Sequence, residues 1–385
     1  MDTKNRKKRI FSILIAGTLI SCPILAEKPA AASDSFRKQK TEERENIDYR
    51  ALVWIDKGSV ERYGGEEVFR GNLEKMFRDT TYFFNESPNK FDYHFTFVPA
   101  GIHGYDMEGD RSRIEEFRKQ AFGKLDTDKY DYVLFLALDS DKNVTSCGGG
   151  GASGQCVVMY CRTLEAQKKG SGLFDKVPPV QGPYSDLGHE YGHMRGATDL
   201  YQYKISAADN PVSHEELKPP ACNMGTGFKV WSDYCSALFN YTAKQKQLDS
   251  RLGRKIFPRK WTIRVFADGK PASDVSVRFY GTRAGGAHNH RDVYPKPYRT
   301  FQTNDEGHVE VTDLYGFFHP AGDDPNIPSK SPVDMFPYFY WFNFLVEASY
   351  GDRKEYVWVP DFVLQEKYLT TGEDTFETVL NFSKG

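Results

Sequence analysis

The residues most suited to chemistry lie in one short stretch, residues 188–199, with the sequence GHEYGHMRGATD. His189 and His193 are four residues apart, so on a helix their imidazoles project from the same face, one turn apart. Two neutral ring nitrogens at this spacing can bind one zinc ion. Glu190 follows the first histidine and can direct its carboxylate at a zinc-bound water without binding the metal itself. The spacing predicts a catalytic zinc site with Glu190 as general base.

The residues after the second histidine supply a third ligand. Gly196 follows His193 by three residues and is expected to end the helix, because glycine tolerates the left-handed backbone conformation. Asp199, three residues further on, can then return to the metal as an oxygen ligand. Three protein ligands leave the fourth zinc position open for water, as catalysis requires.

Two other interpretations of the same residues remain open. The third ligand can instead be Glu215 or Glu216 from a separate downstream helix. Prolines at both ends of residues 211–220 leave little room for that helix, which favours Asp199. The stretch can also be an ordinary amphipathic helix with a glycine after its end and two surface histidines.

The pattern H-E-x-x-H-x-x-G-x-x-D resembles the zinc-binding motif of metzincins, in the variant that is similar to snapalysin and to immune-inhibitor-A-like metallopeptidases. These enzymes have a methionine turn beneath the zinc, and residues 221–227 (ACNMGTG) fit it, with Met224 between Asn and Gly. Some metzincins carry a tyrosine two residues after this methionine, whereas this chain has Thr226. The resemblance covers residues 48–255 and implies an α+β zincin domain that holds Zn²⁺ through His189, His193 and Asp199.

Alternating strands and helices are expected to position this motif. Patterns of apolar residues predict strands at 49–56, 92–99 and 130–138 and helices at 65–86 and 111–125. The metal-binding helix is expected to begin with Ser185 or Asp186 as its N-cap and to run to Arg195. A further helix is expected at 229–250. Tyr201 and Tyr234 can each stabilise a transition state, although most tyrosines of this chain are packing residues.

From Trp261 onwards the sequence changes to short alternating strands separated by Asp-Gly, Gly-Gly and Asp-Glu-Gly turns. This pattern predicts an all-β sandwich over residues 257–385, after a zinc metallopeptidase domain over 48–256. Residues 303–311 resemble the turn and strand of carboxypeptidase-regulatory, transthyretin-like modules.

The first residues indicate export. A basic segment, an apolar segment over residues 10–20 and the sequence LISC predict a lipoprotein-type signal peptide over 1–21, with Cys22 acylated as the mature N-terminus. The alternative is cleavage after Ala26 or near Ala32, which releases a secreted protein. Residues 22–47 are polar and predict a flexible tether. We therefore expect an exported bacterial protein, lipid-anchored to a membrane and facing the periplasm or the cell exterior.

The expected mature chain is mildly acidic. Removing residues 1–21 changes the formal charge from −2 to −6, since five basic groups and one acid are lost, and no basic runs remain. This balance argues against nucleic-acid binding. Of the five cysteines that follow Cys22, Cys222 and Cys235 would tie the methionine turn to the next helix, but the sequence leaves disulfide connectivity open.

Taken together, these features predict an exported, monomeric zinc metalloendopeptidase that hydrolyses protein or peptide substrates. A rival from another class is a surface-binding lipoprotein, in which the sandwich recognises a protein or glycan and the zincin part is a non-catalytic scaffold. A third interpretation is zinc-dependent hydrolysis of a bond other than a peptide bond. The intact motif, Glu190 included, favours the peptidase.

Overall fold

The structure is a computed structural model that describes residues 44–62, 64–86, 91–108, 110–123, 125–137, 156–160, 183–225, 230–246, 248, 252–284, 291–328 and 340–383. Residues 44–385 belong to one compact unit. The predicted signal peptide, Cys22 and most of the tether lie outside the described residues. No helix in the described part of the chain is long and apolar enough to cross a membrane.

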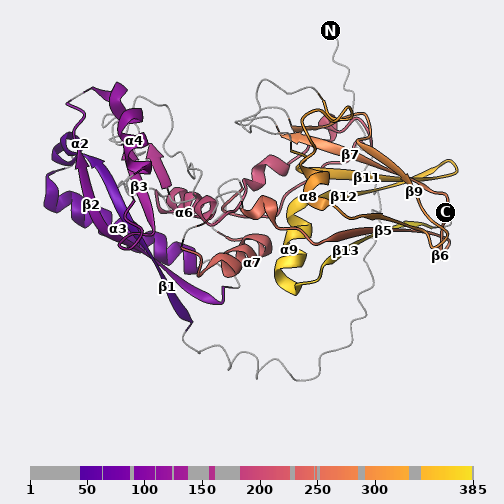
Figure 1. Cartoon of the computed structure of the whole chain (residues 1–385), viewed down its shortest axis with the longest axis horizontal. Helices are drawn as coiled ribbons and strands as arrows, with labels where there is room; N and C mark the ends of the chain where they lie inside the picture. Colours follow the sequence, from indigo (N-terminus) through magenta and orange to yellow (C-terminus); the bar gives the residue numbers. More distant parts are fainter. Residues whose placement is uncertain are drawn as a thin grey trace, which may run out of the picture. The chain divides into compact units, whose positions relative to one another are not determined.

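A four-stranded sheet forms the N-terminal part of the unit, and all of its strands are parallel (Figure 1). Its strand order is β2-β1-β3-β4. The strands are β1 (Glu45–Asp56), β2 (Tyr93–Tyr105), β3 (Tyr132–Ala137) and β4 (Cys156–Tyr160). The three predicted strands are confirmed, but β1 begins inside the predicted tether. Its first residues pair in register with β2 from Tyr93 onwards, which explains the earlier start.

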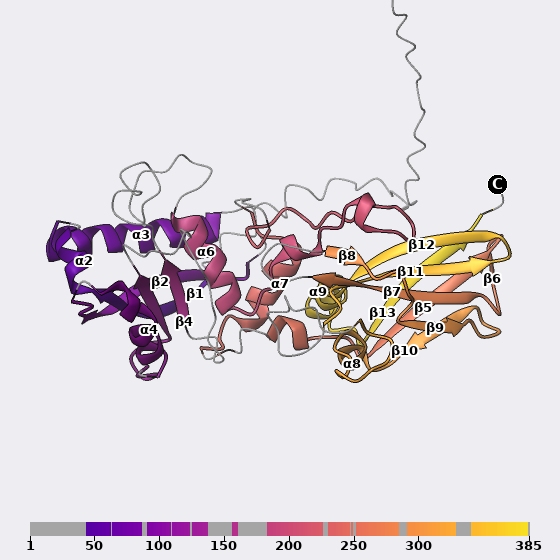
Figure 2. The same ribbon diagram turned by 90° about the horizontal axis from the view of Figure 1, so that it is seen from above.

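Helices cover both faces of this sheet. On one face lie α3 (Glu66–Glu86) and α6 (Pro183–Met194), and on the other lies α4 (Ile114–Phe122) (Figure 2). Successive strand residues point to opposite faces, so Val53 packs with α3 whereas Trp54 packs with α4. A short helix, α2 (Lys57–Arg62), follows β1. The predicted helices at 65–86 and 111–125 are confirmed, although the second begins as a single 3₁₀ turn.

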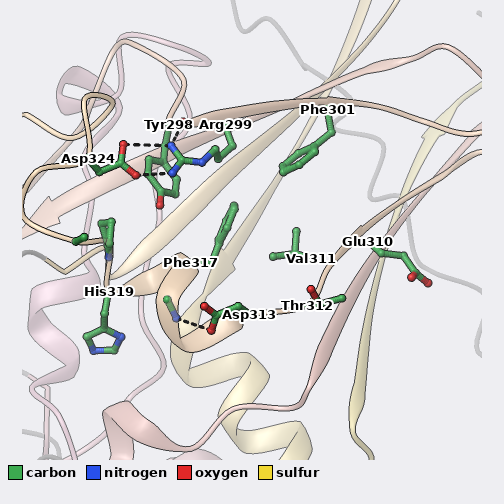
Figure 3. A pocket seen from close by; sticks show the side chains of 13 residues that line it. Tyr298, Arg299, Phe301, Glu310, Val311, Thr312, Asp313, Phe317, His319 and Asp324 are labelled. Carbon is green, nitrogen blue, oxygen red and sulfur yellow. Dashed lines mark hydrogen bonds and ion pairs between the residues drawn. The ribbon is translucent and has the colours of Figure 1, made fainter.

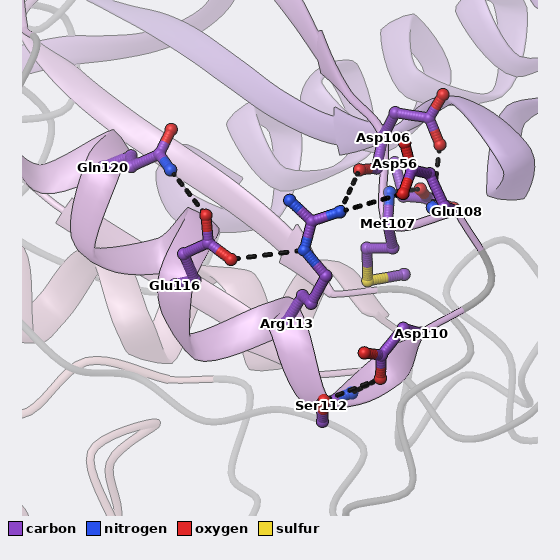
Figure 4. A network of polar contacts seen from close by, with 9 residues as sticks. All are labelled: Asp56, Asp106, Met107, Glu108, Asp110, Ser112, Arg113, Glu116 and Gln120. Atoms are coloured by element: carbon purple, nitrogen blue, oxygen red, sulfur yellow. Dashed lines mark hydrogen bonds and ion pairs between the residues drawn. The ribbon is translucent and has the colours of Figure 1, made fainter.

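A polar network fixes the carboxyl end of β1 (Figure 4). Asp56 is buried, and its carboxylate accepts hydrogen bonds from the backbone N–H of Ser59 at 2.8 Å and of Met107 at 3.1 Å. Arg113 donates to Glu116 at 3.2 Å, beside the same connection. The carboxylates of Asp56 and Glu116 thus accept hydrogen bonds from neighbouring groups, and these bonds stabilise the connection between the sheet and α4.

The C-terminal part is rich in β-strands and contains two sheets. One has the order β10-β5-β13 with β6 on β5, and the other has the order β12-β11-β7-β8 with β9 on β7. The strands are β5 (Lys260–Ala267), β6 (Lys270–Pro271), β7 (Ser276–Ala284), β8 (Arg291–Val293), β9 (Arg299–Gln302), β10 (His308–Val311), β11 (Asn343–Tyr350), β12 (Arg353–Pro360) and β13 (Thr375–Phe382). Trp261 of the first sheet contacts Phe279 of the second, with ring centroids 5.3 Å apart, so the two sheets share an aromatic core.

The expectation of an all-β C-terminal region is wrong in one respect. Two helices, α8 (Leu314–Phe318) and α9 (Asp361–Thr371), lie among its strands. Helix α9 follows Pro360 and ends at Gly372, whose φ of 68° is the left-handed conformation of a glycine after a helix. The proline and the glycine at the two ends of α9 are signals of a helix, but the alternating pattern of the neighbouring segments predicted strands throughout this region.

Residues of the β-rich part contact the chain segment that follows Asp199. Helix α7 (Asp233–Thr242) packs against α9. The hydroxyl of Tyr203 donates a hydrogen bond to Asp361 of α9 at 2.6 Å. Further along, Ile205 packs in one apolar cluster with Val293 of β8. The segment after Asp199 is therefore positioned by residues much later in the sequence.

Candidate metal centre

Helix α6 carries the motif and ends where the glycine predicts. The backbone N–H of Ala197 donates to the carbonyl of Gly192 at 3.0 Å, and that of Gly196 to His193 at 2.9 Å. Gly196 has a φ of 88°, so the three features together form a Schellman motif. The helix begins at Pro183, so Ser185 and Asp186 lie inside it and the predicted N-cap is wrong. Proline suits the first helical position because its missing N–H has no helical partner there.

The structure brings the three predicted ligands together. Oδ1 of Asp199 lies 3.1 Å from Nε2 of His189 and 3.1 Å from Nε2 of His193. The three candidate ligand atoms all lie within 4.8 Å of one another, and in the described part of the chain they are the one such group of histidine, cysteine and carboxylate residues. Their side chains are 20, 21 and 14% exposed, so solvent can reach the group. The alternative ligands Glu215 and Glu216 are not part of it.

Backbone carbonyls fix the orientation of both imidazoles. Nδ1 of His189 lies 2.7 Å from the carbonyl oxygen of Asn223, and Nδ1 of His193 lies 2.9 Å from that of Ala197. A carbonyl oxygen can only accept, so in the neutral imidazole Nδ1 carries the proton and Nε2 presents a lone pair. Oδ1 of Asp199 is buried and lies 3.1 Å from both Nε2 atoms. When both imidazoles are neutral, three lone pairs converge on one point, which fits a bound cation.

The charges of the group are strongly coupled. Burial lowers the pKa of His189, but its hydrogen bond to Asp199, the charges of Glu190 and Asp199, and the Asn223 carbonyl outweigh burial and raise the pKa to about 9. His193 likewise has a raised pKa, because the charge and hydrogen bond of Asp199 outweigh burial. Burial raises the pKa of Asp199, but the two histidines lower it well below its usual value. A metal ion would replace these protons, so its binding releases them.

Two further side chains and Glu190 complete the group. The second carboxylate oxygen of Asp199 accepts hydrogen bonds from the hydroxyl of Tyr201 at 2.7 Å and from the amide of Gln202 at 3.2 Å. Glu190 is 5% exposed, and its charge acts on both histidines and on Tyr201. Of the two candidate tyrosines, Tyr201 lies at the group. Tyr234 is buried in the core, with its ring 5.9 Å from that of Phe362.

The turn at residues 222–225 supports the motif from below. Met224 is buried, and its Sδ lies so close to α6 that a Cβ on Gly192 would come within 2.3 Å of it. The carbonyl of Met224 accepts a hydrogen bond from the backbone N–H of Leu200, one residue after Asp199, at 2.7 Å. The same turn supplies the Asn223 carbonyl that orients the first histidine. One turn therefore positions the helix, a histidine and the third-ligand segment.

The turn is also tied to the helix that follows it. Cys222 and Cys235 are both buried, and their sulfur atoms lie 3.5 Å apart as free thiols. The structure thus brings together two cysteines whose pairing the sequence left open, and a disulfide between them stays a prediction.

Sequence reasoning missed several contributors to the group. Gln202 and the Asn223 carbonyl had no signal beyond nearness to the motif. Arg291 of β8 was also missed, and its guanidinium lies 5.4 Å from the ring centre of Tyr201. Nothing in the sequence relates Arg291 to the motif, because packing in the β-rich part brings it there.

The β-rich part contains a separate cavity of about 650 Å³, lined by residues of β9, β10 and α8 and by the chain that follows α8 (Figure 3). Aromatic side chains of Phe301 and Phe317 line it together with polar groups. Arg299 is paired with Asp324 in an ion pair, and its guanidinium lies 3.9 Å from the ring centre of Tyr298. The charge of this arginine is therefore already compensated.

Comparisons with known proteins assign no family. No family model matches the chain, and no curated protein sequence matches it. A solved "Structure of a chaperone-substrate complex" shares 11% identity at a TM-score of 0.34, over 52% of this chain and 38% of that one. The dioxygenase domain of a dioxygenase carbohydrate-binding protein fusion from Streptomyces sp. SirexAA-E shares 18% identity at a TM-score of 0.17, over 33% of this chain and 81% of that one. Likeness at this level supports no conclusion about fold or function, so the group of ligands is the basis for a functional proposal.

Proposed function

We propose that the protein is a zinc-dependent endopeptidase of the metzincin type, with a zincin-like catalytic part followed by a β-sandwich. The single observation that carries the proposal is the convergence of His189, His193 and Asp199, with both Nδ1 atoms bound by carbonyls. Two imidazoles and one carboxylate, with an open position, are the donor set of a catalytic zinc site.

Each residue of the group has a role in this proposal. His189, His193 and Asp199 hold the metal, which when bound activates water and polarises the carbonyl of the substrate. Glu190 accepts the proton of the attacking water and passes it to the leaving amine. Tyr201 and Gln202 hold the second oxygen of Asp199, so that the first stays directed at the histidines.

The donor set by itself also fits iron(II), since two histidines and one carboxylate form the ligands of many non-haem oxygenases. Two features favour zinc. An iron centre of that kind has no need of Glu190, which is buried directly beside the first ligand. The methionine turn beneath α6 is the arrangement that the metzincin resemblance implies for zinc. Metal analysis of the purified chain tests this directly, and stoichiometric iron in place of zinc would exclude the proposal.

The decisive experiment is hydrolysis of a mixed peptide library by the full chain, with and without a zinc chelator, beside Glu190→Gln. We expect internal peptide bonds to be cleaved by the wild type, cleavage to stop with chelator and to return with added zinc. The variant should bind zinc stoichiometrically but lose cleavage, because Glu190 is no ligand. Glu216→Gln is the matched control, since Glu216 lies outside the ligand group. Cleavage that persists in Glu190→Gln would overturn the proposed mechanism.

The second candidate, a surface-binding lipoprotein, is favoured by the cavity between Phe301 and Phe317. In that case partner binding survives Glu190→Gln and chelation but fails when the cavity is filled, for example by Ala321→Trp at its exposed lining. Zinc-dependent hydrolysis of another bond is the third candidate. It predicts stoichiometric zinc without peptide cleavage and activity on ester or amide substrates that is lost in Glu190→Gln.

We also propose export and lipid anchoring through Cys22. Only the sequence supports this, through the basic and apolar segments that precede the cysteine. Mass measurement of the mature N-terminus distinguishes an acylated Cys22 from cleavage after Ala26 or near Ala32.

A further inference from the structure

A single arginine from the β-rich part reaches the candidate metal centre. Arg291 is the first residue of β8, and its guanidinium lies 5.4 Å from the ring centre of Tyr201. The hydroxyl of that tyrosine donates to Asp199 at 2.7 Å, so the positive charge stands one side chain away from a metal ligand. Arg291 also interacts electrostatically with Asp199, although the two side chains form no ion pair.

Strand pairing and packing hold this arginine in place. Strand β8 pairs antiparallel with β7, with Arg291 opposite Ala284 and Val293 opposite Thr282. Alternate residues of a strand lie on the same side, and Val293 is buried in the cluster that contains Ile205. Arg291 therefore extends from the side of β8 that faces the segment after the metal ligand. Its position follows from the fold rather than from a flexible side chain on an open surface.

The guanidinium has hydrogen-bond donors to spare. Its Nε is buried and has no hydrogen-bond acceptor among the described residues. Within the described ranges its guanidinium has no acidic partner within ion-pair distance, and Oδ2 of Asp199 is already occupied by Tyr201 and Gln202. By contrast, Arg299 pairs with Asp324 and Arg278 pairs with Glu347. A buried N–H without an acceptor is unfavourable, and the side chain as a whole stays partly exposed. The guanidinium is therefore suited to an acceptor that arrives with a ligand.

The geometry points to Arg291 as a substrate-binding residue that holds a carboxylate of the substrate beside the scissile bond. This inference rests on the proposed peptidase function and narrows its substrates to peptides with a carboxylate near the cleaved bond. A guanidinium presents paired N–H donors that match the two oxygens of a carboxylate. The ring of Tyr201 lies within cation–π distance of the guanidinium and helps to hold it beside the group.

A peptide can supply that carboxylate from its C-terminus or from an aspartate or glutamate side chain. The two sources predict different specificities: cleavage of bonds near a free C-terminus in the first case, and cleavage beside acidic residues within the peptide in the second. Four peptides that share one sequence except beside the cleaved bond separate them: the free C-terminal acid, its C-terminal amide, and the amide with either glutamate or glutamine beside the cleaved bond.

The test compares Arg291→Gln and Arg291→Lys with the wild type on these four peptides. We expect Arg291→Gln to lower kcat/KM about 10- to 100-fold for the carboxylate-bearing peptides and to leave the neutral peptides within about twofold, as expected for a lost charged hydrogen bond. The kcat/KM of Arg291→Lys for these peptides should lie between those of the wild type and Arg291→Gln, since lysine keeps the positive charge but lacks the paired N–H donors of a guanidinium. The matched control is Arg353→Gln, because the Arg353 guanidinium also lies 5.4 Å from a tyrosine ring, that of Tyr350.

A binding measurement keeps this inference separate from the proposed activity. We would load the full chain carrying Glu190→Gln with zinc and titrate the same peptides calorimetrically, with and without Arg291→Gln. About tenfold weaker binding of the acidic peptides alone supports the assignment, even if the wild type cleaves no peptide and the peptidase proposal fails. Equal loss for acidic and neutral peptides, loss of zinc in Arg291→Gln, or no carboxylate preference in the wild type would overturn it.

Discussion

Two carboxylates, the partly buried Asp199 and the buried Glu347, have opposite surroundings. Glu347 lies on β11, where Arg278, Lys354 and Tyr356 all bind its two oxygens, the last two at 3.0 and 2.9 Å. Asp199 has one oxygen bound by hydroxyl and amide donors, whereas its other oxygen faces two imidazole nitrogens at 3.1 Å. Both oxygens of Glu347 accept hydrogen bonds from the protein. One oxygen of Asp199 instead lies next to the two imidazole nitrogens that would bind a cation with it.

The difference shows how a carboxylate in a structural network can be distinguished from one in a candidate metal site. Burying a carboxylate is costly unless donors or cations compensate it. At Glu347 the protein supplies every partner itself, so the network stabilises the β11–β12 pairing. At Asp199 the protein aligns acceptors and fixes each imidazole from behind, which favours an added cation. The following predictions test this contrast, from the largest expected effect to the smallest.

The largest effect is expected for Glu190→Gln. The variant should lose about 10²- to 10⁴-fold in kcat, because a positioned general base contributes that much. Glu347→Gln is the structural counterpart: it should lower the free energy of unfolding and leave kcat unchanged. Peptide hydrolysis and thermal unfolding of both variants check this. The contrast would break if Glu347→Gln reduced kcat as strongly as Glu190→Gln.

A smaller effect is expected for Asp199→Asn on metal binding. The amide keeps the shape but removes the charge opposite the two histidines, so zinc affinity should fall by at least about 100-fold, on the scale known for groups around metal sites. Competition with a chelator of known affinity measures this. Glu215→Gln, at the rejected alternative ligand, should leave zinc affinity unchanged. Loss of zinc in that control would restore the alternative geometry.

Gly192→Ala should lower the free energy of unfolding by about 1–3 kcal/mol, as overpacking does. The new Cβ would lie 2.3 Å from Sδ of Met224, so the turn beneath α6 must shift. Gly71→Ala in α3 is the matched control, since a Cβ there meets no atom within 4 Å. That change should stabilise the protein by about 0.5–1 kcal/mol through helix propensity. Denaturant unfolding of both variants measures these changes. Equal changes in the free energy of unfolding would show that Met224 is not closely packed on α6.

The smallest effect, counted per pH unit, concerns Asp361, the carboxyl that binds Tyr203. Burial raises the pKa of Asp361 to about 7, against the hydrogen bond from Tyr203 and the charge of Arg254. The folded protein therefore holds a proton that the unfolded chain releases near pH 4, and stability from this group falls as pH rises from about 4 to about 7. The slope is at most about 1.4 kcal/mol per pH unit.

The measurement is the free energy of unfolding against pH for the wild type and Asp361→Asn. The variant cannot ionise, so its curve should lack this decline between pH 4 and pH 7. Glu347 provides the comparison. Burial raises its pKa, but the hydrogen bonds from Arg278, Lys354 and Tyr356 outweigh burial and lower the pKa. The stability that Glu347 contributes should therefore be lost as pH falls below the pKa of a glutamate in the unfolded chain. Identical pH curves for the wild type and Asp361→Asn would contradict the assignment.

Several local features followed from the sequence alone. The spacing of His189 and His193 placed both rings on one face of α6, and Gly196 ended that helix because only a residue tolerant of positive φ fits there. Apolar periodicity located the strands and helices of the first sheet, since burial on a regular element repeats along the chain. Asp199 lies only six residues after His193, and this short distance along the chain was enough to predict that it lies beside the two histidines.

Tertiary structure alone decided the surroundings of those residues. The carbonyl of Asn223 orients His189, Met224 fills the space that Gly192 leaves, and Arg291 arrives from a strand of the β-rich part. No local pattern encodes these contacts, because each depends on packing between segments far apart in the chain. The amino-acid sequence determined which atoms can bind a metal, and the fold determined which other atoms face them.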